Sequence, residues 1–231
     1  MYWAGRSLNP PRPNKTINRN IGFHNYYYHQ VLLFFIFILF SFFSSSAQLP
    51  DQQIHDLKSG RVKNDTSYIY WLPYASGKSF FLIQGWESMH SHKGELALDF
   101  KMRTGTSIHA AREGIVTEIK EEASGGGLKD EFLNKGNHIL IQHSDGTIGG
   151  YWHLQKNGAL IELGDTIKKG QLIALSGNTG YSAFPHLHFW VYKKEGVFKT
   201  LPTRFVTKNG VRYLRPGKYY QSVHEEKTSK K

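Results

Sequence analysis

Two histidines separated by a single residue, His186 and His188, are the side chains of this chain best arranged to do chemistry. In an extended strand over residues 186–191, alternation places both imidazoles on one face, with Leu187 and Phe189 on the opposite face. Imidazole nitrogens that share a face are typical ligands of a transition-metal ion. The spacing therefore predicts a metal site on one side of a strand and apolar packing on the other.

The composition limits what such a site can contain. The 231 residues include no cysteine, which excludes disulfides, cysteine-ligated zinc and cysteine nucleophiles, so histidine and carboxylate side chains must hold any metal. A hydrophobic content of 39% and this length allow the core of one domain. The net charge of +11 favours polyanionic surroundings such as nucleic acid, anionic lipid or a cell wall, without choosing among them.

An export signal is expected near the N-terminus. Residues 31–43 are apolar except for one serine; basic residues precede them, and small residues follow up to Ala47. This order is typical of a secretory signal, and the run is short for a membrane span of about 20 residues. We predict a leader and signal peptide over residues 1–47, cleavage after Ala47 and an exported, periplasmic or extracellular protein. An uncleaved signal anchor and a buried core helix are the alternatives. Cleavage leaves 25 basic and 18 acidic residues, a net charge of +7.

The rest of the sequence predicts a mainly β fold. Short apolar runs at residues 114–119, 138–142 and 170–175 end at turn-forming residues, and no long helical periodicity is present. An Asn-Gly pair predicts a hairpin within residues 204–214, and the glycine-rich residues 121–136 predict a surface loop that overhangs a cleft. We expect a single domain on an antiparallel β-sheet, with a sandwich- or barrel-like core and long loops lining a cleft.

Four motifs follow one another in a fixed order along the chain. They are Ser91-His92-Lys93-Gly94 with Ala97-Leu98-Asp99-Phe100; Asn137 with His143-Ser144-Asp145-Gly146-Thr147; Tyr151-Trp152-His153-Leu154; and Ser176-Gly177-Asn178-Thr179-Gly180-Tyr181-Ser182 with Pro185-His186-Leu187-His188-Phe189. In this order the motifs resemble the lysostaphin/LytM-type zinc metalloendopeptidases, which cut peptidoglycan cross-links. Any one motif alone is a weak signal, whereas four in order are specific.

The resemblance implies a zinc cofactor held by His92, Asp99 and His188, and two catalytic histidines, His153 and His186. The donor set is chemically consistent, because a catalytic zinc keeps three protein ligands and leaves a fourth position for water, whose pKa falls to about 7. We expect His186 to act as the general base and His153 to donate to the oxyanion or to orient the water, with the assignment between the two left open.

The spacing of the first two ligands departs from the common family pattern. His92 and Asp99 are seven residues apart, whereas four is common, and some members resemble this chain in having the longer interval. His90 is the alternative first ligand; His92 is preferred because a serine precedes it, as in the longer pattern. Asp99 is supported by alternation, since Leu98 and Phe100 can face the core while Asp99 faces the cleft.

We therefore expect an exported zinc metalloendopeptidase that hydrolyses peptide bonds in peptidoglycan stem peptides or cross-bridges. Its metallopeptidase domain is expected at residues 85–198, between an N-terminal segment at 48–84 and a C-terminal hairpin and polar tail at 199–231. The alternative is a catalytically inactive family member that binds and regulates other cell-wall hydrolases.

The expected partners are peptidoglycan peptides, with the membrane involved only through an uncleaved signal segment. Residues 164–171 resemble a turn of biotinyl and lipoyl carrier domains, but the modified-lysine motif is missing. Nucleic-acid binding is not expected, because only the net charge favours it. The sequence leaves open which bond is cut, the oligomeric state and whether residues 48–84 occlude the cleft.

Overall fold

The structure is a computed structural model that describes Asp56 and residues 68–88, 91–195 and 197–224, without the side chains of residues 195 and 197–199. The predicted leader and signal peptide lie outside the described residues. Among the described residues, no helix is long and apolar enough to cross a membrane.

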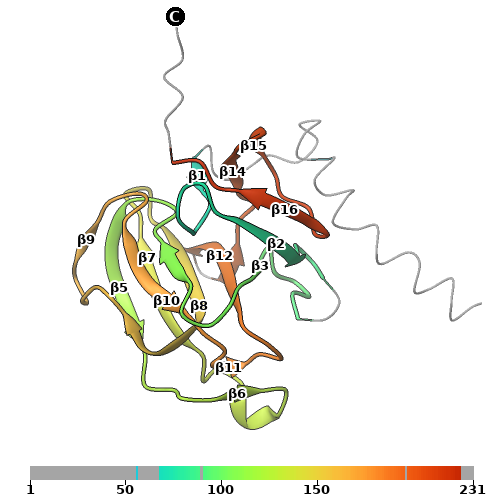
Figure 1. The fold of residues 1–231 in the computed structure, drawn as a ribbon. Coiled ribbons are helices and arrows are strands. Elements are labelled where there is room, and N and C mark those ends of the chain that lie inside the picture. Colours follow the sequence, from blue (N-terminus) through green and yellow to red (C-terminus); the bar gives the residue numbers. More distant parts are fainter. Residues whose placement is uncertain (1–55, 57–67, 89–90, 196, 225–231) are drawn as a thin grey trace, which may run out of the picture. The chain divides into compact units, whose positions relative to one another are not determined.

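The described part of the chain is almost entirely β-structure (Figure 1). Its elements are β1 (Ile69–Trp71), β2 (Ser79–Gln84), β3 (Leu98–Lys101), β4 (Ser107–His109), β5 (Gly114–Lys120), β6 (Gly126–Gly127), the 3-10 helix η1 (Asp130–Phe132), β7 (Asn137–Gln142), β8 (Thr147–Ala159), β9 (Thr166–Ile167), β10 (Leu172–Ser176), β11 (Gly180–Tyr181), β12 (His186–Glu195), β13 (Val197–Thr200), β14 (Arg204–Thr207), β15 (Gly210–Arg212) and β16 (Lys218–Gln221).

One large sheet organises these strands. Its path runs β16-β2-β3-β12-β8-β7-β5-β9, with β10 joined to β4 and β8, and β13 joined to β12. Every pairing within this sheet is antiparallel. Two small sheets, β1-β14-β15 and β6-β11, accompany it. The predicted fold class, mainly β on an antiparallel sheet, is confirmed, and the described strands do not close into a barrel.

The central strands carry different side chains on their two faces. On β12, Leu187 and Phe189 are fully buried in the main core, as are Leu98 and Phe100 on the neighbouring β3. Burying each of these side chains contributes about 2–3 kcal/mol. The intervening residues of both strands face the other side, where a smaller apolar cluster includes Ala97. The alternation predicted from the sequence is confirmed, and it fixes which face carries the polar residues.

The individual strand predictions also agree with the structure. Residues 114–119, 138–142 and 170–175 correspond to β5, β7 and β10. The predicted Asn-Gly hairpin is the antiparallel pair β14-β15, and Gly210 adopts a φ of 97° that glycine accommodates without strain. Beyond it, β16 forms the edge of the large sheet by pairing with β2.

Residues 121–136, predicted as a surface loop, are fastened to the segment that leads into β12. The loop contains β6, which pairs with β11, and η1. Gly180 in β11 has a φ of 76°, and a Cβ atom there would clash with the backbone of Gly136. This close approach of two backbones requires glycine at position 180.

The contact between Gly180 and Gly136 can be tested by two alanine substitutions. Gly146 has a similar φ of 79°, but no atom lies within 4 Å of its Cβ position. We expect Gly146→Ala to lower the free energy of unfolding by about 1–2 kcal/mol from backbone strain alone. Gly180→Ala should lower it by about 3 kcal/mol or more, because the clash adds to the strain. Urea unfolding of both variants measures the difference, and equal losses would show that the close approach is unimportant.

Candidate metal centre

Three side chains from two strands and a loop meet on the polar face of the large sheet. The antiparallel register of β3 and β12 places Asp99 opposite His188, and His92 comes from the loop before β3. Oδ1 of Asp99 lies 2.9 Å from Nδ1 of His188 and 3.1 Å from Nε2 of His92. One ligand atom from each of the three residues lies within 4.8 Å of the others. These are the residues expected to bind zinc.

The electrostatics of this cluster suit a cation. His92 and Asp99 are almost fully buried. Burial by itself raises the pKa of the Asp99 carboxyl, but the hydrogen bond with His188 and the close contact with His92 outweigh burial and hold that pKa well below its usual range. Asp99 is therefore a buried carboxylate anion at neutral pH.

The orientation of His92 shows that the three residues fit a metal ion. Its Nδ1 donates to the carbonyl oxygen of Gly85 at 2.9 Å. Because a carbonyl only accepts, Nδ1 carries the proton of the neutral ring and Nε2 carries the lone pair. That Nε2 is buried and lies 3.1 Å from Oδ1 of Asp99, in a geometry that does not make a hydrogen bond. The ligand atoms of a tetrahedral zinc are about 3.3 Å apart at ordinary bond lengths. The distances from Oδ1 of Asp99 to Nδ1 of His188 and Nε2 of His92, 2.9 and 3.1 Å, are close to this value.

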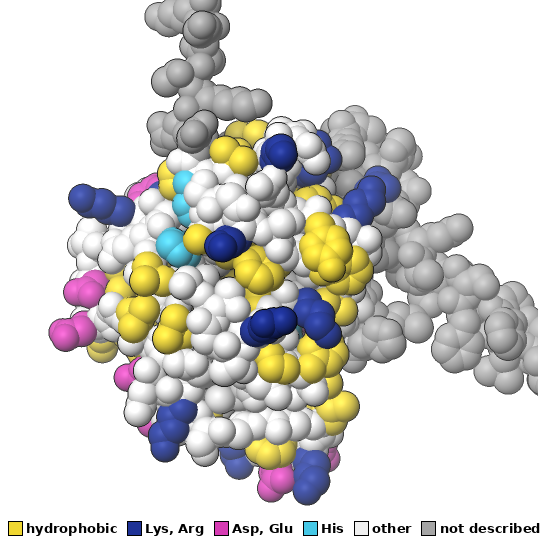
Figure 2. All heavy atoms as spheres, in the orientation of Figure 1, with side chains coloured by type: hydrophobic (Ala, Val, Ile, Leu, Met, Phe, Trp, Pro, Cys, Tyr) yellow, Lys and Arg dark blue, Asp and Glu magenta, His cyan; other side chains and the backbone are white. Residues whose placement is uncertain are grey.

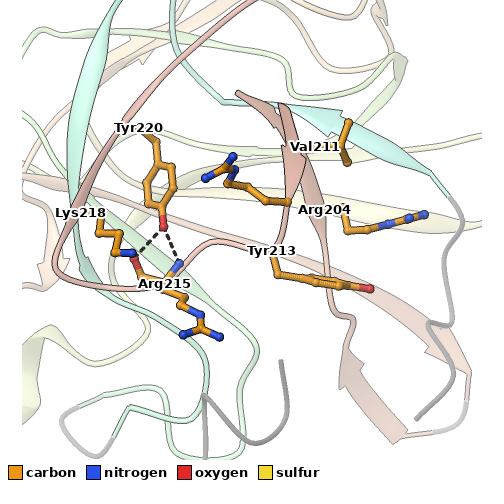
Figure 3. Close-up of a pocket in the computed structure, with 7 residues that line it drawn as sticks. Arg204, Val211, Tyr213, Arg215, Lys218 and Tyr220 are labelled. Atoms are coloured by element: carbon orange, nitrogen blue, oxygen red, sulfur yellow. Dashed lines mark hydrogen bonds between the residues drawn. The ribbon is translucent and has the colours of Figure 1, made fainter. Parts of the chain in front are cut away.

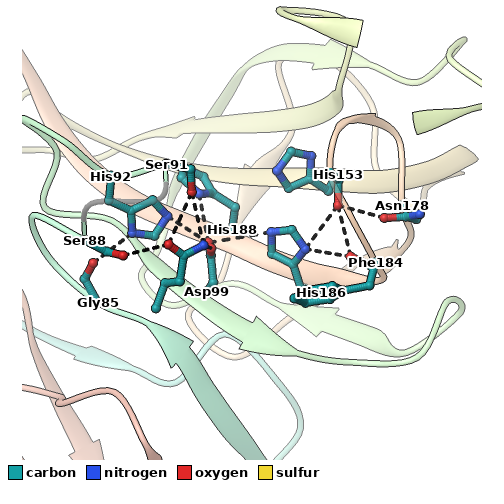
Figure 4. Close-up of polar contacts among 12 residues, drawn as sticks. Gly85, Ser88, Ser91, His92, Asp99, His153, Asn178, Phe184, His186 and His188 are labelled. Atoms are coloured by element: carbon teal, nitrogen blue, oxygen red, sulfur yellow. Dashed lines mark hydrogen bonds and ion pairs between the residues drawn. The ribbon is translucent and has the colours of Figure 1, made fainter. Parts of the chain in front are cut away.

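Two further histidines extend this cluster in one direction. Figure 4 shows the side chains in a row, from His92 through Asp99 and His188 to His186 and His153. The ring centroids of His153 and His186 are 4.7 Å apart. Nε2 of His186 lies 3.7 Å from Oδ1 of Asp99.

Backbone carbonyls fix the tautomers of this second pair. Nδ1 of His153 donates to the oxygen of Thr179, and Nδ1 of His186 donates to that of Phe184, each at 2.8 Å. Both neutral rings therefore keep an Nε2 lone pair. Burial, with the neighbouring histidines, lowers the pKa of His153 to about 3, and burial lowers that of His186. Both rings are proton acceptors at neutral pH.

A β-bulge directs His153 into this cluster. On β7, His138 pairs with Trp152 and Asn137 pairs with Leu154, so His153 is an extra residue without an opposite partner. It has a φ of 64°, a left-handed conformation that is uncommon for residues other than glycine. Regular alternation would have turned His153 toward the core, on the same face as Tyr151, whereas the bulge turns it toward His186.

The residues that orient the cluster were not found from the sequence. Nε2 of Gln84 donates to Oδ2 of Asp99 at 2.9 Å, and Oε1 of Gln84 accepts from the hydroxyl of Ser88 at 2.8 Å. The carbonyls that accept from the histidines belong to the main chain and leave no residue-type signal. His90, the alternative first ligand, lies outside the described residues.

Comparisons with known proteins converge on one family. Residues 91–199 match the model described as Peptidase family M23. An uncharacterized metalloprotease of Buchnera aphidicola subsp. Baizongia pistaciae is 39% identical over 49% of this chain and 27% of its own length. Glycyl-glycine endopeptidase ALE-1 of Staphylococcus capitis is 36% identical over 40% and 23%. Peptidoglycan DD-endopeptidase ShyA of Vibrio cholerae is 34% identical over 39% and 18%. The chain thus spans about a quarter or less of the length of these relatives.

Gln84 offers a test of how the buried carboxylate is held. We expect Gln84→Ala to weaken zinc binding by about 10–100-fold, because Oδ2 of Asp99 loses the donor that fixes the carboxylate plane. Gln221→Ala serves as the control and should leave zinc binding unchanged, because the amide of Gln221 donates to the carbonyl of Gly77 and not to a residue of the cluster. Competition with a fluorescent zinc chelator measures both affinities. An unchanged affinity in Gln84→Ala would show that Gln84 does not support the site.

Proposed function

We propose that this chain, whose residues 91–199 match the model of Peptidase family M23, is a zinc-dependent endopeptidase that hydrolyses peptide bonds of peptidoglycan. The observation that carries the proposal is the convergence of His92, Asp99 and His188 around one point. Two imidazoles and one carboxylate are a donor set typical of catalytic zinc. Nε2 of His92 is buried 3.1 Å from Oδ1 of Asp99 and makes no hydrogen bond with any described residue.

The three ligand atoms in this proposal are Nε2 of His92, Oδ1 of Asp99 and Nδ1 of His188. When bound, zinc supplies a Lewis acid that polarises the scissile carbonyl and lowers the pKa of a coordinated water to about 7. The hydrogen bond to Gly85 holds the ring of His92, and Gln84 holds the carboxylate of Asp99.

His186 takes the role of general base. Its Nε2 lone pair is available, and its ring lies next to the ligand set. His153 has no proton to donate to an oxyanion, because its Nδ1 proton is donated to the carbonyl of Thr179 and its low pKa keeps Nε2 unprotonated. Of the two roles expected for it, His153 therefore takes orientation of the attacking water. Removing a positioned base typically costs about 10²–10⁴-fold in rate.

Several features favour peptidoglycan as the substrate. Relatives that share about a third of the matched residues are a glycyl-glycine endopeptidase and a peptidoglycan DD-endopeptidase. The basic leader and apolar run of residues 1–47 favour export to the compartment that contains peptidoglycan. The positive net charge favours approach to an anionic wall. The complete ligand set favours catalysis over a regulatory role without metal.

The assignment of roles is tested by comparing zinc content and hydrolysis of purified peptidoglycan in the full chain and its variants. We expect about one zinc per chain. His92→Ala and His188→Ala should lose both zinc and activity, because each removes a ligand. His186→Ala should keep zinc and lose about 10²–10⁴-fold in rate, because it removes only the base.

His109 provides the control, since its Nδ1 bonds to the carbonyl of Gly170 away from the site. His109→Gln should keep zinc and activity. Activity of His186→Ala close to that of the parent would contradict the role of His186 as base. A parent chain that binds no zinc would contradict the proposal as a whole.

A further inference from the structure

A basic segment follows the region matched by the family model. Residues 201–224 contain five Lys or Arg residues and no Asp or Glu. Figure 2 shows Lys and Arg side chains spread over much of this face, several of them toward β14–β16, and Asp and Glu at its left and lower edges. A segment that carries charges of one sign attracts anions and raises their local concentration.

The fold gathers four of these cations around one cavity of about 810 Å³. The cavity lies between the small sheet β1-β14-β15 and the edge strand β16, and we call it the cationic pocket. Figure 3 shows Lys218, Tyr220 and Arg215 on one side, and Arg204, Val211 and Tyr213 on the other. Its described lining residues, which also include Arg212, contain no acidic side chain.

Hydrogen bonds and packing hold the walls of the cationic pocket. The hydroxyl of Tyr220 accepts from the backbone N–H of Arg215 at 2.8 Å and donates to its carbonyl at 3.0 Å. The guanidinium of Arg212 donates to the carbonyl of Asn209. The ring of Tyr213 packs edge-on against Trp86, with centroids 5.5 Å apart. The cations are therefore presented by an ordered scaffold.

The chemistry of these side chains selects the class of ligand. Arginine presents a planar fork of N–H donors that matches the two oxygens of a carboxylate or phosphate, and charge-assisted bonds of this kind are stronger than neutral ones. The volume falls within the range of about 300–1,000 Å³ that is common for ligand sites.

We propose that the cationic pocket is a second binding site, separate from the metal centre, that takes carboxylate or phosphate groups of a polyanion. The proposed function supplies only the identity of that polyanion, an anionic cell-wall polymer. The pocket also adjoins the segment that orients the first metal ligand. Pro216 packs against Gly85, where a Cβ atom would lie 3.0 Å from the proline ring, and the carbonyl of Gly85 accepts from His92.

Calorimetric titration of the full chain in the His188→Ala background tests this site without cleavage of the probe. Two probes distinguish the sources of the anion: inorganic phosphate, and soluble peptidoglycan stem peptides, which carry carboxylates and no phosphate. We expect at least one probe to bind, and binding to weaken as salt rises. Binding of phosphate alone supports a phosphate-bearing polymer, and binding of the peptides alone supports carboxylates.

The variant Arg212→Gln/Lys218→Gln removes two cations of the cationic pocket. It should bind the same probe about tenfold more weakly, a loss of about 1.4 kcal/mol. Lys156→Gln, an exposed lysine on β8, should leave binding unchanged. Equal thermal unfolding midpoints show that the variants are folded.

Failure of both probes to bind, or equal binding by the double variant and its parent, would overturn the proposal. Neither result depends on zinc or on hydrolysis. Loss of the proposed peptidase function alone would leave the phosphate titration and its variant intact, so the two failures are distinguishable.

Discussion

The antiparallel pairing of β3 with β12 is the constraint on which the metal centre depends. It places Asp99 directly opposite His188 and turns both toward the same face, while Leu98 and Phe189 anchor the opposite face in the core. A slip of one residue in this register would send a ligand into the apolar core. Because such a slip would also expose apolar core residues, the packing of the core stabilises the register that brings the ligands together.

A second constraint works against regular strand geometry. The bulge at His153 places a strained residue beside His186, where alternation alone would have buried it in the core. The neighbouring segment is held by the close contact of Gly180 with Gly136, and its Thr179 carbonyl fixes the ring of His153. Packing of the loop over residues 121–136 thus helps to hold the proton-accepting pair.

The sequence predicted those parts of the site that depend on strand periodicity. The shared face of His186 and His188 and the orientation of Asp99 follow from alternation, and the order of the motifs supplied His92. The bulge was not predictable, because a strand pattern does not reveal an inserted residue. Carbonyls such as that of Gly85 have no residue-type signal. From the sequence, the basic C-terminal residues could be recognised only by their charge. Their position around one cavity could not be predicted, because it depends on the pairing of β16 with β2 at the edge of the large sheet.

The central claim is that three particular atoms hold zinc, and a crystal structure of the zinc-loaded chain at the zinc absorption edge tests it most directly. The account predicts one anomalous peak bonded to Nε2 of His92, Oδ1 of Asp99 and Nδ1 of His188, at about 2.0–2.2 Å. His186 should lie outside the coordination sphere with its Nε2 directed toward the open position. A peak bonded to His90 or His186 in place of these ligands would contradict the account.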